Sequence, residues 1–174
     1  MKDALAIHRW LLAHQVHHEI VRLPRPMTCA DELPETLSAP PERCLMVTVF
    51  EVATRIGGEA VVAVVSPVAN PPRQGAVGGL LGVRQVRPAA AHVVNAATDY
   101  ADGLVCPLLL PESLPMLIDD RLRTDAEPVF TATGERHTAL RVGALDLLSF
   151  LPGKMVDLRS PRPRGSREAV ARRH

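Results

Sequence analysis

The chain has 174 residues, 47% of them hydrophobic, with a mean hydropathy of +0.07, so it can bury one core of ordinary domain size. No run of about 18 apolar residues occurs, and charges and histidines interrupt the N-terminal segment, which argues against a membrane span or a secretory signal and predicts a cytoplasmic protein. Three scattered cysteines without a CxxC pair and only 3% aromatic residues argue against a disulfide framework, a zinc ribbon and a base-stacking platform.

The formal net charge of +1 hides a division along the chain. Residues 159–174 carry six arginines and one glutamate, which leaves the rest of the chain mildly acidic. Proline, glycine and serine without an apolar face predict a disordered tail at 159–174, following a single domain at 1–158. Such a basic arm either contacts phosphates through charge alone or serves as a solubilising end without a partner.

The first 40 residues predict a helix, a strand and a second helix. The segment 3–15 places apolar side chains on one side and begins with Asp3 as a plausible N-cap, so we expect a helix. A strand is predicted at 17–24. The segment 28–37 predicts a short helix with Asp31 in the capping-box position.

Two strongly β-prone segments follow, at 44–52 and 59–67. Both are rich in valine and other residues that favour strands. A connection that contains Gly57 and Gly58 joins them, which is typical of a hairpin turn. We therefore predict that the two strands pair with each other.

Shorter elements fill the rest of the domain. We expect helices at 71–82, 89–100 and 143–152, and strands at 83–88, 114–119, 127–132, 139–142 and 154–158. Many short strands with peripheral helices are typical of a mixed sheet rather than a doubly wound parallel one. The predicted fold class is therefore α+β, with a mixed, mostly antiparallel curved sheet or partial barrel and peripheral helices.

Three stretches resemble known functional motifs but lack the residues or the spacing that the motif requires. The glycines of 78–82 lack both the GxGxxG spacing and the lysine of a phosphate loop. His14, His17, His18 and Glu19 suggest a metal hydrolase, but adjacent side chains on a strand point to opposite faces, so we predict no metal there. Cys106 has no base beside it in sequence and is interpreted as a buried thiol.

The stretch "YADGLVCPLLLPESLPMLIDD", residues 100–120, matches neither a helix nor a strand. It places Gly103 four residues before Pro107. Taken alone, the two residues indicate a turn. A glycine also lets main-chain N–H groups approach a carbonyl oxygen, and a proline stiffens the loop that holds them.

Four stretches in order, "PPERCLMVTVF", "GGLLGVRQVRPA", "TDYADGLVCP" and "ATGERHTALRVGALDLLSFLPGKMVDL", resemble the YbaK-type and prolyl-tRNA synthetase-associated editing domains. The resemblance covers about residues 3 to 158. It implies a free-standing aminoacyl-tRNA deacylase, which hydrolyses the ester of a small mischarged amino acid without a cofactor. The implied partner is the 3′ end of transfer RNA carrying an amino acid, with a synthetase as a second, optional partner.

The resemblance also implies where the site lies. Its glycine, three residues, proline loop corresponds to Gly103 with Leu104, Val105, Cys106 and Pro107. A following turn corresponds to Gly134 and His137, and Arg136 between them is a further candidate for binding the substrate. Gly103 and His137 are the implied catalytic positions, because backbone donors hold an oxyanion and a neutral imidazole can order a water. His137 as an exposed turn residue is the alternative.

One position departs from the family pattern. Met46 aligns with a lysine that many members carry, and a thioether can neither carry positive charge nor donate a hydrogen bond. Arg43 is the nearest replacement, while Arg84, Arg87, Arg136 and Arg141 could reach the site from other elements. Two functions therefore stay open: an active deacylase, and an impaired relative that binds an aminoacyl or nucleotide-like ligand or a protein partner. Contacts with RNA phosphates are expected from Arg43, Arg159, Arg162 and Arg164.

Overall fold

The computed structural model describes residues 1–159, so Arg162 and Arg164 lie outside the described residues. The helices are α1 (Ala4–Ala13), η1 (Ala30–Glu32), α2 (Leu33–Leu37), η2 (Pro41–Arg43), α3 (Gln74–Leu81), α4 (Ala91–Thr98) and α5 (Ala144–Ser149). The strands are β1 (His18–Arg22), β2 (Leu45–Ala53), β3 (Glu59–Pro67), β4 (Gln85–Pro88), β5 (Met116–Asp119), β6 (Pro128–Ala132), β7 (Thr138–Gly143) and β8 (Lys154–Val156).

The strands of residues 1–159 form two sheets that do not close into a barrel. A three-stranded antiparallel sheet has the order β1-β7-β6, and a five-stranded sheet has the order β4-β2-β3-β5-β8. In the larger sheet β3, β5 and β8 run parallel, whereas the other pairs are antiparallel. The predicted α+β class with mostly antiparallel pairing is confirmed, and an isolated bridge from Cys44 to Phe130 connects the two sheets.

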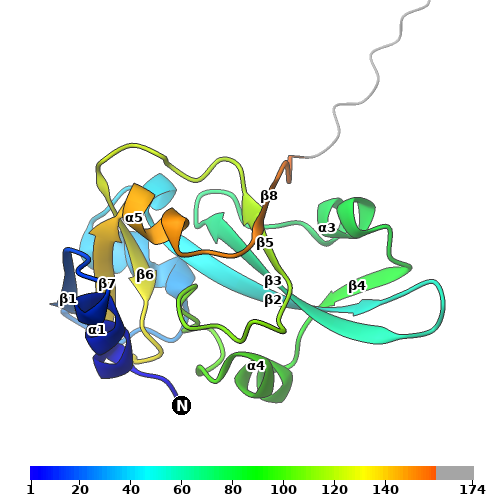
Figure 1. The fold of residues 1–174 in the computed structure, drawn as a ribbon, viewed down its shortest axis with the longest axis horizontal. Coiled ribbons are helices and arrows are strands. Elements are labelled where there is room, and N and C mark those ends of the chain that lie inside the picture. Colours follow the sequence, from blue (N-terminus) through cyan, green and yellow to red (C-terminus); the bar gives the residue numbers. More distant parts are fainter. Residues whose placement is uncertain (160–174) are drawn as a thin grey trace, which may run out of the picture.

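The predicted hairpin forms the longest pairing in the molecule. β2 and β3 pair over their full length, from Leu45 with Pro67 to Ala53 with Glu59. Figure 1 shows this hairpin extending away from the small sheet, with β4 along its outer part. Its alternating side chains separate two layers of the core, because successive residues of a strand point to opposite faces.

Three clusters of buried side chains make up the core. The largest joins α1, α5 and both sheets through Ile7, Val65 and Leu140. A second packs α3 against the outer half of the hairpin around Phe50. The third joins residues 23–33, the small sheet and Leu104, and the candidate site lies beside it.

Helix α1 begins as expected but ends earlier than predicted. Asp3 is the N-cap, and its carboxylate accepts a hydrogen bond from the Ala6 N–H at 2.9 Å. The segment ends at His14, so the helix is shorter than the predicted 3–15. Among residues 1–159, no helix combines the length and the apolarity that crossing a bilayer requires.

Candidate functional site

Two backbone segments far apart in sequence face each other across an open pocket of about 770 Å³. One segment follows α4, and the other is the turn between β6 and β7. The lining residues are Thr28, Ala101, Asp102, Leu104, Gly134, Glu135, Arg136 and His137. This volume is within the usual range for a small-ligand site.

Gly103 holds the first wall against the segment that precedes η1. Its φ is +81°, and a Cβ at this position would lie 2.6 Å from the Thr28 carbonyl oxygen. The Gly103 carbonyl in turn accepts a hydrogen bond from the Ala30 N–H at 2.8 Å. Only glycine satisfies both the backbone angle and the close approach.

The segment against which Gly103 packs is itself fixed by Glu32. The Thr28 hydroxyl donates to Glu32 Oε1 at 2.6 Å, and the N–H groups of Thr28 and Cys29 point to the same oxygen at 3.2 and 3.3 Å. These bonds, led by that of the Thr28 hydroxyl, lower the pKa of Glu32. The capping carboxylate is therefore Glu32 and not Asp31, because the N-cap is Cys29, one residue later than the predicted Thr28.

Gly134 has the equivalent role in the second wall. Its φ is +91°, and a Cβ there would lie 2.5 Å from the Lys2 carbonyl oxygen and 2.9 Å from Tyr100 Cδ1. The turn is closed by the hydroxyls of Thr133 and Thr138, which are 2.7 Å apart, and Thr138 Oγ1 donates to Glu135 Oε2 at 3.0 Å. A glycine with positive φ and no room for a side chain thus anchors each wall.

The rim of the pocket carries charged and polar side chains that make no bond to the rest of residues 1–159. Arg136 and His137 are exposed, and only their carbonyls are engaged, by the N–H groups of Met27 (2.9 Å) and Leu23 (2.8 Å). Within residues 1–159 their side chains, and the carboxylate of Asp102, have no hydrogen-bond or ion-pair partner. These groups are available to a ligand.

The sequence profile of the aminoacyl-tRNA editing domain matches residues 25–150. The chain belongs to this family. Both walls of the pocket lie within the matched segment of the editing domain, whereas Lys2, which contacts Gly134, lies outside it.

Solved structures share the fold of this editing domain. A protein from work on computational epitope grafting has 20% identity and a TM-score of 0.71, with 90% of this chain and 96% of that chain covered. A hypothetical protein has 23% identity and a TM-score of 0.69, covering 87% and 97%. A candidate trans-editing enzyme for prolyl tRNA synthetase has 23% identity and a TM-score of 0.67, covering 83% and 88%. No curated protein matches the chain.

The predicted loop residues of the editing domain divide between two environments. Leu104 lines the pocket, although only 3% of its surface is exposed. Val105 and Cys106 are buried in the largest core cluster, behind the wall. Pro107 lines a separate apolar groove with Trp10 and Phe150. Of the four residues after Gly103, the first thus faces the pocket and the next two belong to the core.

The thiols of the editing domain are not prepared for nucleophilic attack. Burial raises the pKa of Cys106 to about 12 and that of Cys44 to about 12. Burial also raises the pKa of Cys29, which is only partly covered. Because the thiolate is the nucleophile, all three remain protonated near neutral pH, which agrees with the interpretation of Cys106 as a buried thiol.

Met46 lies next to the pocket but does not line it. It is partly buried and packs against the cluster that contains Leu104, with Ala101 at its edge. Its partner across the hairpin is Ser66, whose fully buried hydroxyl has no hydrogen-bond partner in residues 1–159. Met46 therefore lies between apolar side chains and a buried hydroxyl that has no hydrogen-bond partner in residues 1–159.

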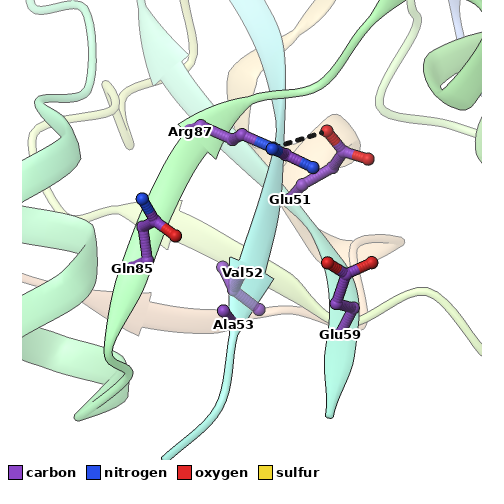
Figure 2. Close-up of a pocket in the computed structure, with 6 residues that line it drawn as sticks. All are labelled: Glu51, Val52, Ala53, Glu59, Gln85 and Arg87. Atoms are coloured by element: carbon purple, nitrogen blue, oxygen red, sulfur yellow. Dashed lines mark hydrogen bonds and ion pairs between the residues drawn. The ribbon is translucent and has the colours of Figure 1, made fainter. Parts of the chain in front are cut away.

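Most of the arginines considered as replacements for a lysine lie elsewhere. Arg43 binds Asp125 through two hydrogen bonds of 3.0 and 2.7 Å. Arg87 pairs with Glu51 at 3.1 Å (Figure 2), and Arg141 with Glu19 at 3.9 Å. Arg84 lines a pocket beside the hairpin loop. Of the five, Arg136 is the one that lines the candidate site.

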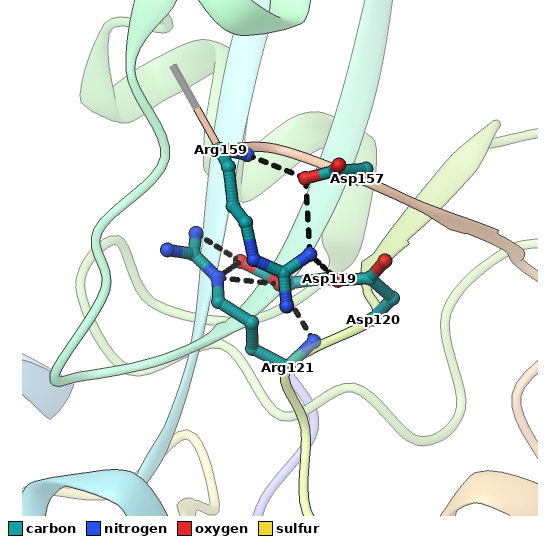
Figure 3. Close-up of polar contacts among 5 residues, drawn as sticks. All are labelled: Asp119, Asp120, Arg121, Asp157 and Arg159. Atoms are coloured by element: carbon teal, nitrogen blue, oxygen red, sulfur yellow. Dashed lines mark hydrogen bonds and ion pairs between the residues drawn. The ribbon is translucent and has the colours of Figure 1, made fainter. Parts of the chain in front are cut away.

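Arg159, the first residue of the predicted basic tail, is held by carboxylates. Its guanidinium lies 2.8 Å from Asp120 and 3.1 Å from Asp157, beside the Asp119 and Arg121 pair (Figure 3). Residues 160–174 lie outside the described part of the chain. The structure therefore ties the start of the predicted tail to the edge of the larger sheet.

The N-terminal histidines of the editing domain are used in separate contacts. His14 Nδ1 lies 2.8 Å from the Trp10 carbonyl oxygen, and His18 Nε2 lies 2.8 Å from His8 Nδ1. His17 lines a different pocket, next to Asp146. No cluster of three metal-ligating side chains occurs among residues 1–159.

Four lining residues were not predicted from the sequence: Thr28, Ala101, Asp102 and Glu135. Asp102 and Glu135 are the immediate neighbours of the two anchoring glycines, so their adjacency to Gly103 and Gly134 was an available signal. Thr28 lies at the site because Gly103 packs closely against it, and no local sequence pattern predicts that contact.

Proposed function

We propose that this editing domain hydrolyses the ester between a small mischarged amino acid and the 3′ end of a transfer RNA, acting in trans. The observation that carries the proposal is the pair of glycine-anchored walls, with an apolar wall residue and unbound charged groups at the rim. An ester substrate needs such a combination, because its acyl group is small and its nucleotide end is anionic.

The proposed chemistry is the attack of water on the ester carbonyl carbon. Gly103 does not itself line the pocket, but it lies between two residues that do, Asp102 and Leu104. Within residues 1–159 its N–H has no acceptor, and in the proposed reaction this N–H binds the oxyanion that develops. His137 orders the water and accepts its proton. The bond between the carbonyl carbon and the ribose oxygen then breaks, and that oxygen takes a proton, which releases the free amino acid and the transfer RNA.

The remaining residues of the loop and its neighbours either line the pocket or support its wall. Leu104 and Ala101 form the apolar wall and accept a small side chain such as that of alanine or cysteine. Val105, Cys106 and Pro107 hold this wall in place from the core side. The pocket is open, so the nucleotide end of the substrate extends past its rim.

Arg136 is the proposed contact for the terminal phosphate of the substrate. Its guanidinium has no internal partner in the described chain and lies at the rim beside His137, and arginine binds phosphate through paired hydrogen bonds. Arg43 and Arg159 are bound by carboxylates, so a role of these two in RNA binding requires exchange of those partners. Arg162 and Arg164 remain proposed RNA contacts outside the described residues.

The test is hydrolysis of alanyl, cysteinyl and seryl esters of non-cognate transfer RNAs by the wild type, Met46→Lys and Met46→Leu. We expect the wild type to hydrolyse at least one ester, with Met46→Leu similar to it. Activity in Met46→Lys alone would favour the impaired relative, in which a lysine restores a charge near the buried Ser66 hydroxyl. Hydrolysis by none of the three folded proteins would contradict the proposal.

A further inference from the structure

Lys2 contacts Gly134 in one wall of the candidate pocket and the residues that lead into the other wall, although it lies outside the segment that the family profile matches. Its N–H donates to the Asp99 carbonyl at 2.8 Å, and its Nζ donates to the Thr98 carbonyl at 3.1 Å. Its own carbonyl oxygen occupies the space where Gly134 would have a Cβ. One residue thus joins the end of α4 to the turn between β6 and β7.

Tyr100 lies between Lys2 and the loop that carries Gly103 and contacts both. The Tyr100 ring is completely buried, with Lys2 Nζ 5.3 Å from its centroid, and its edge abuts Gly134. The Tyr100 hydroxyl donates to the Leu108 carbonyl at 2.6 Å. The two ends of the segment 100–108 are thereby connected, and Gly103 and Leu104 lie between them.

We propose that Lys2 is a positioning residue for the reaction: through Tyr100 and Gly134 it sets the separation of the two pocket walls. The inference rests on the proposed function for its effect on catalysis. Its physical reason is that the oxyanion donor and His137 lie on opposite walls, so their relative position depends on whatever braces the walls. A small misplacement of reacting groups lowers the rate strongly, even when the substrate still binds.

The kinetic test compares Lys2→Met, Lys2→Arg and the control Arg9→Met. Met keeps the length of the side chain but removes the donor and the charge, and Arg9 is an exposed residue of the neighbouring helix. We expect Lys2→Met to lower kcat about tenfold with KM changed less than about twofold, and Lys2→Arg to recover most of the rate. A kcat equal to that of the wild type, or a fall shared by Arg9→Met, would overturn the inference.

A second measurement separates this inference from the proposed function. Amide hydrogen exchange follows the segments 100–108 and 133–138 in the same three variants and does not depend on turnover. We expect protection of both segments to fall together by about fivefold in Lys2→Met and to stay unchanged in Arg9→Met. Unchanged protection in Lys2→Met would overturn the bracing role, whereas a silent wild type with altered protection would contradict only the proposed function.

Tyr100→Phe provides a milder variant in case Lys2→Met does not fold. It removes the hydroxyl that bonds to Leu108 and leaves the ring next to Gly134 in place. We expect a smaller loss of kcat and a loss of protection confined to 100–108. Loss of protection spread evenly over the whole domain would indicate general destabilisation and would count against a local brace.

Discussion

The pocket rim and the edge of the larger sheet both carry charged side chains, but these have opposite surroundings. At the sheet edge, fully buried Asp119 binds Arg121 with contacts down to 2.7 Å, and Arg159 binds Asp120 and Asp157 (Figure 3). At the rim, Arg136, His137 and Asp102 have no side-chain partner within residues 1–159. The walls of the pocket are held instead by the close packing of Gly103 and Gly134 and by hydrogen bonds of uncharged hydroxyls and of Glu32.

This difference distinguishes charged side chains that stabilise the fold from charged side chains that are available to bind a ligand. A buried carboxylate requires its partner, because an unpaired charge away from water is strongly unfavourable. An exposed guanidinium without a partner adds little to stability and remains free to bind an anion. The comparison therefore predicts that variants at the sheet edge change stability and variants at the rim change activity.

The largest expected effect concerns the backbone contacts of the pocket. Gly103→Val meets both an unfavourable φ of +81° and the Thr28 carbonyl, so we expect it to lower the free energy of unfolding by about 3 kcal/mol and to abolish hydrolysis. The control Gly57→Ala has φ of +90° and no atom within 4 Å, so we expect a loss of about 1 kcal/mol. Urea unfolding measures both, and equal losses would contradict the close-approach argument.

The most direct test removes one arginine from each region and compares the effects on stability and on activity. Arg121→Met leaves the Asp119 carboxylate buried without its partner, so we expect a loss of about 3 kcal/mol in unfolding free energy, with kcat/KM unchanged in the folded protein. Arg136→Met should change stability by less than about 0.5 kcal/mol while lowering kcat/KM. The comparison fails if Arg136→Met destabilises the domain or if Arg121→Met alters kcat/KM at a temperature where it is folded.

A smaller effect is expected at the exposed part of the sheet-edge network. Arg159 is about half exposed, and its partners Asp120 and Asp157 are also accessible. Because solvent screens such pairs, Arg159→Met should lower the unfolding free energy by less than about 1 kcal/mol. Thermal unfolding of Arg159→Met beside Arg121→Met checks this order, and a larger loss at Arg159 would mean that the network depends on its outer member.

The smallest effect concerns the thiol next to the pocket. Cys29 is partly exposed, whereas Cys44 and Cys106 are buried. Burial raises the pKa of Cys29 above its usual value of 9.0, so its thiolate fraction and its alkylation rate should still be rising with pH at pH 9. We expect a thiol reagent to modify Cys29 slowly at pH 8 and to reach the other two only after unfolding; rapid reaction of two thiols in the native protein would contradict this burial pattern.

The amino-acid sequence by itself predicted the order of the main helices and strands, although not the short helix η2, and it singled out the two glycines that anchor the pocket walls. Helix α1 with its Asp3 cap and the β2–β3 hairpin follow from apolar periodicity and capping, which are local properties of a segment. Gly103 and Gly134 were identified through a family resemblance, and both have the positive φ that only glycine adopts easily.

Only the tertiary structure decided how these elements meet. Four features join segments that are distant in sequence. They are the parallel pairing of β3, β5 and β8, the partners of Arg43 and Arg159, the inward position of Val105 to Pro107, and the contact of Lys2 with Gly134. Local patterns show which side chains are buried but not what covers them. The covering partner is set by long-range packing, and at this pocket that packing determines which side chains of residues 1–159 are left without a partner.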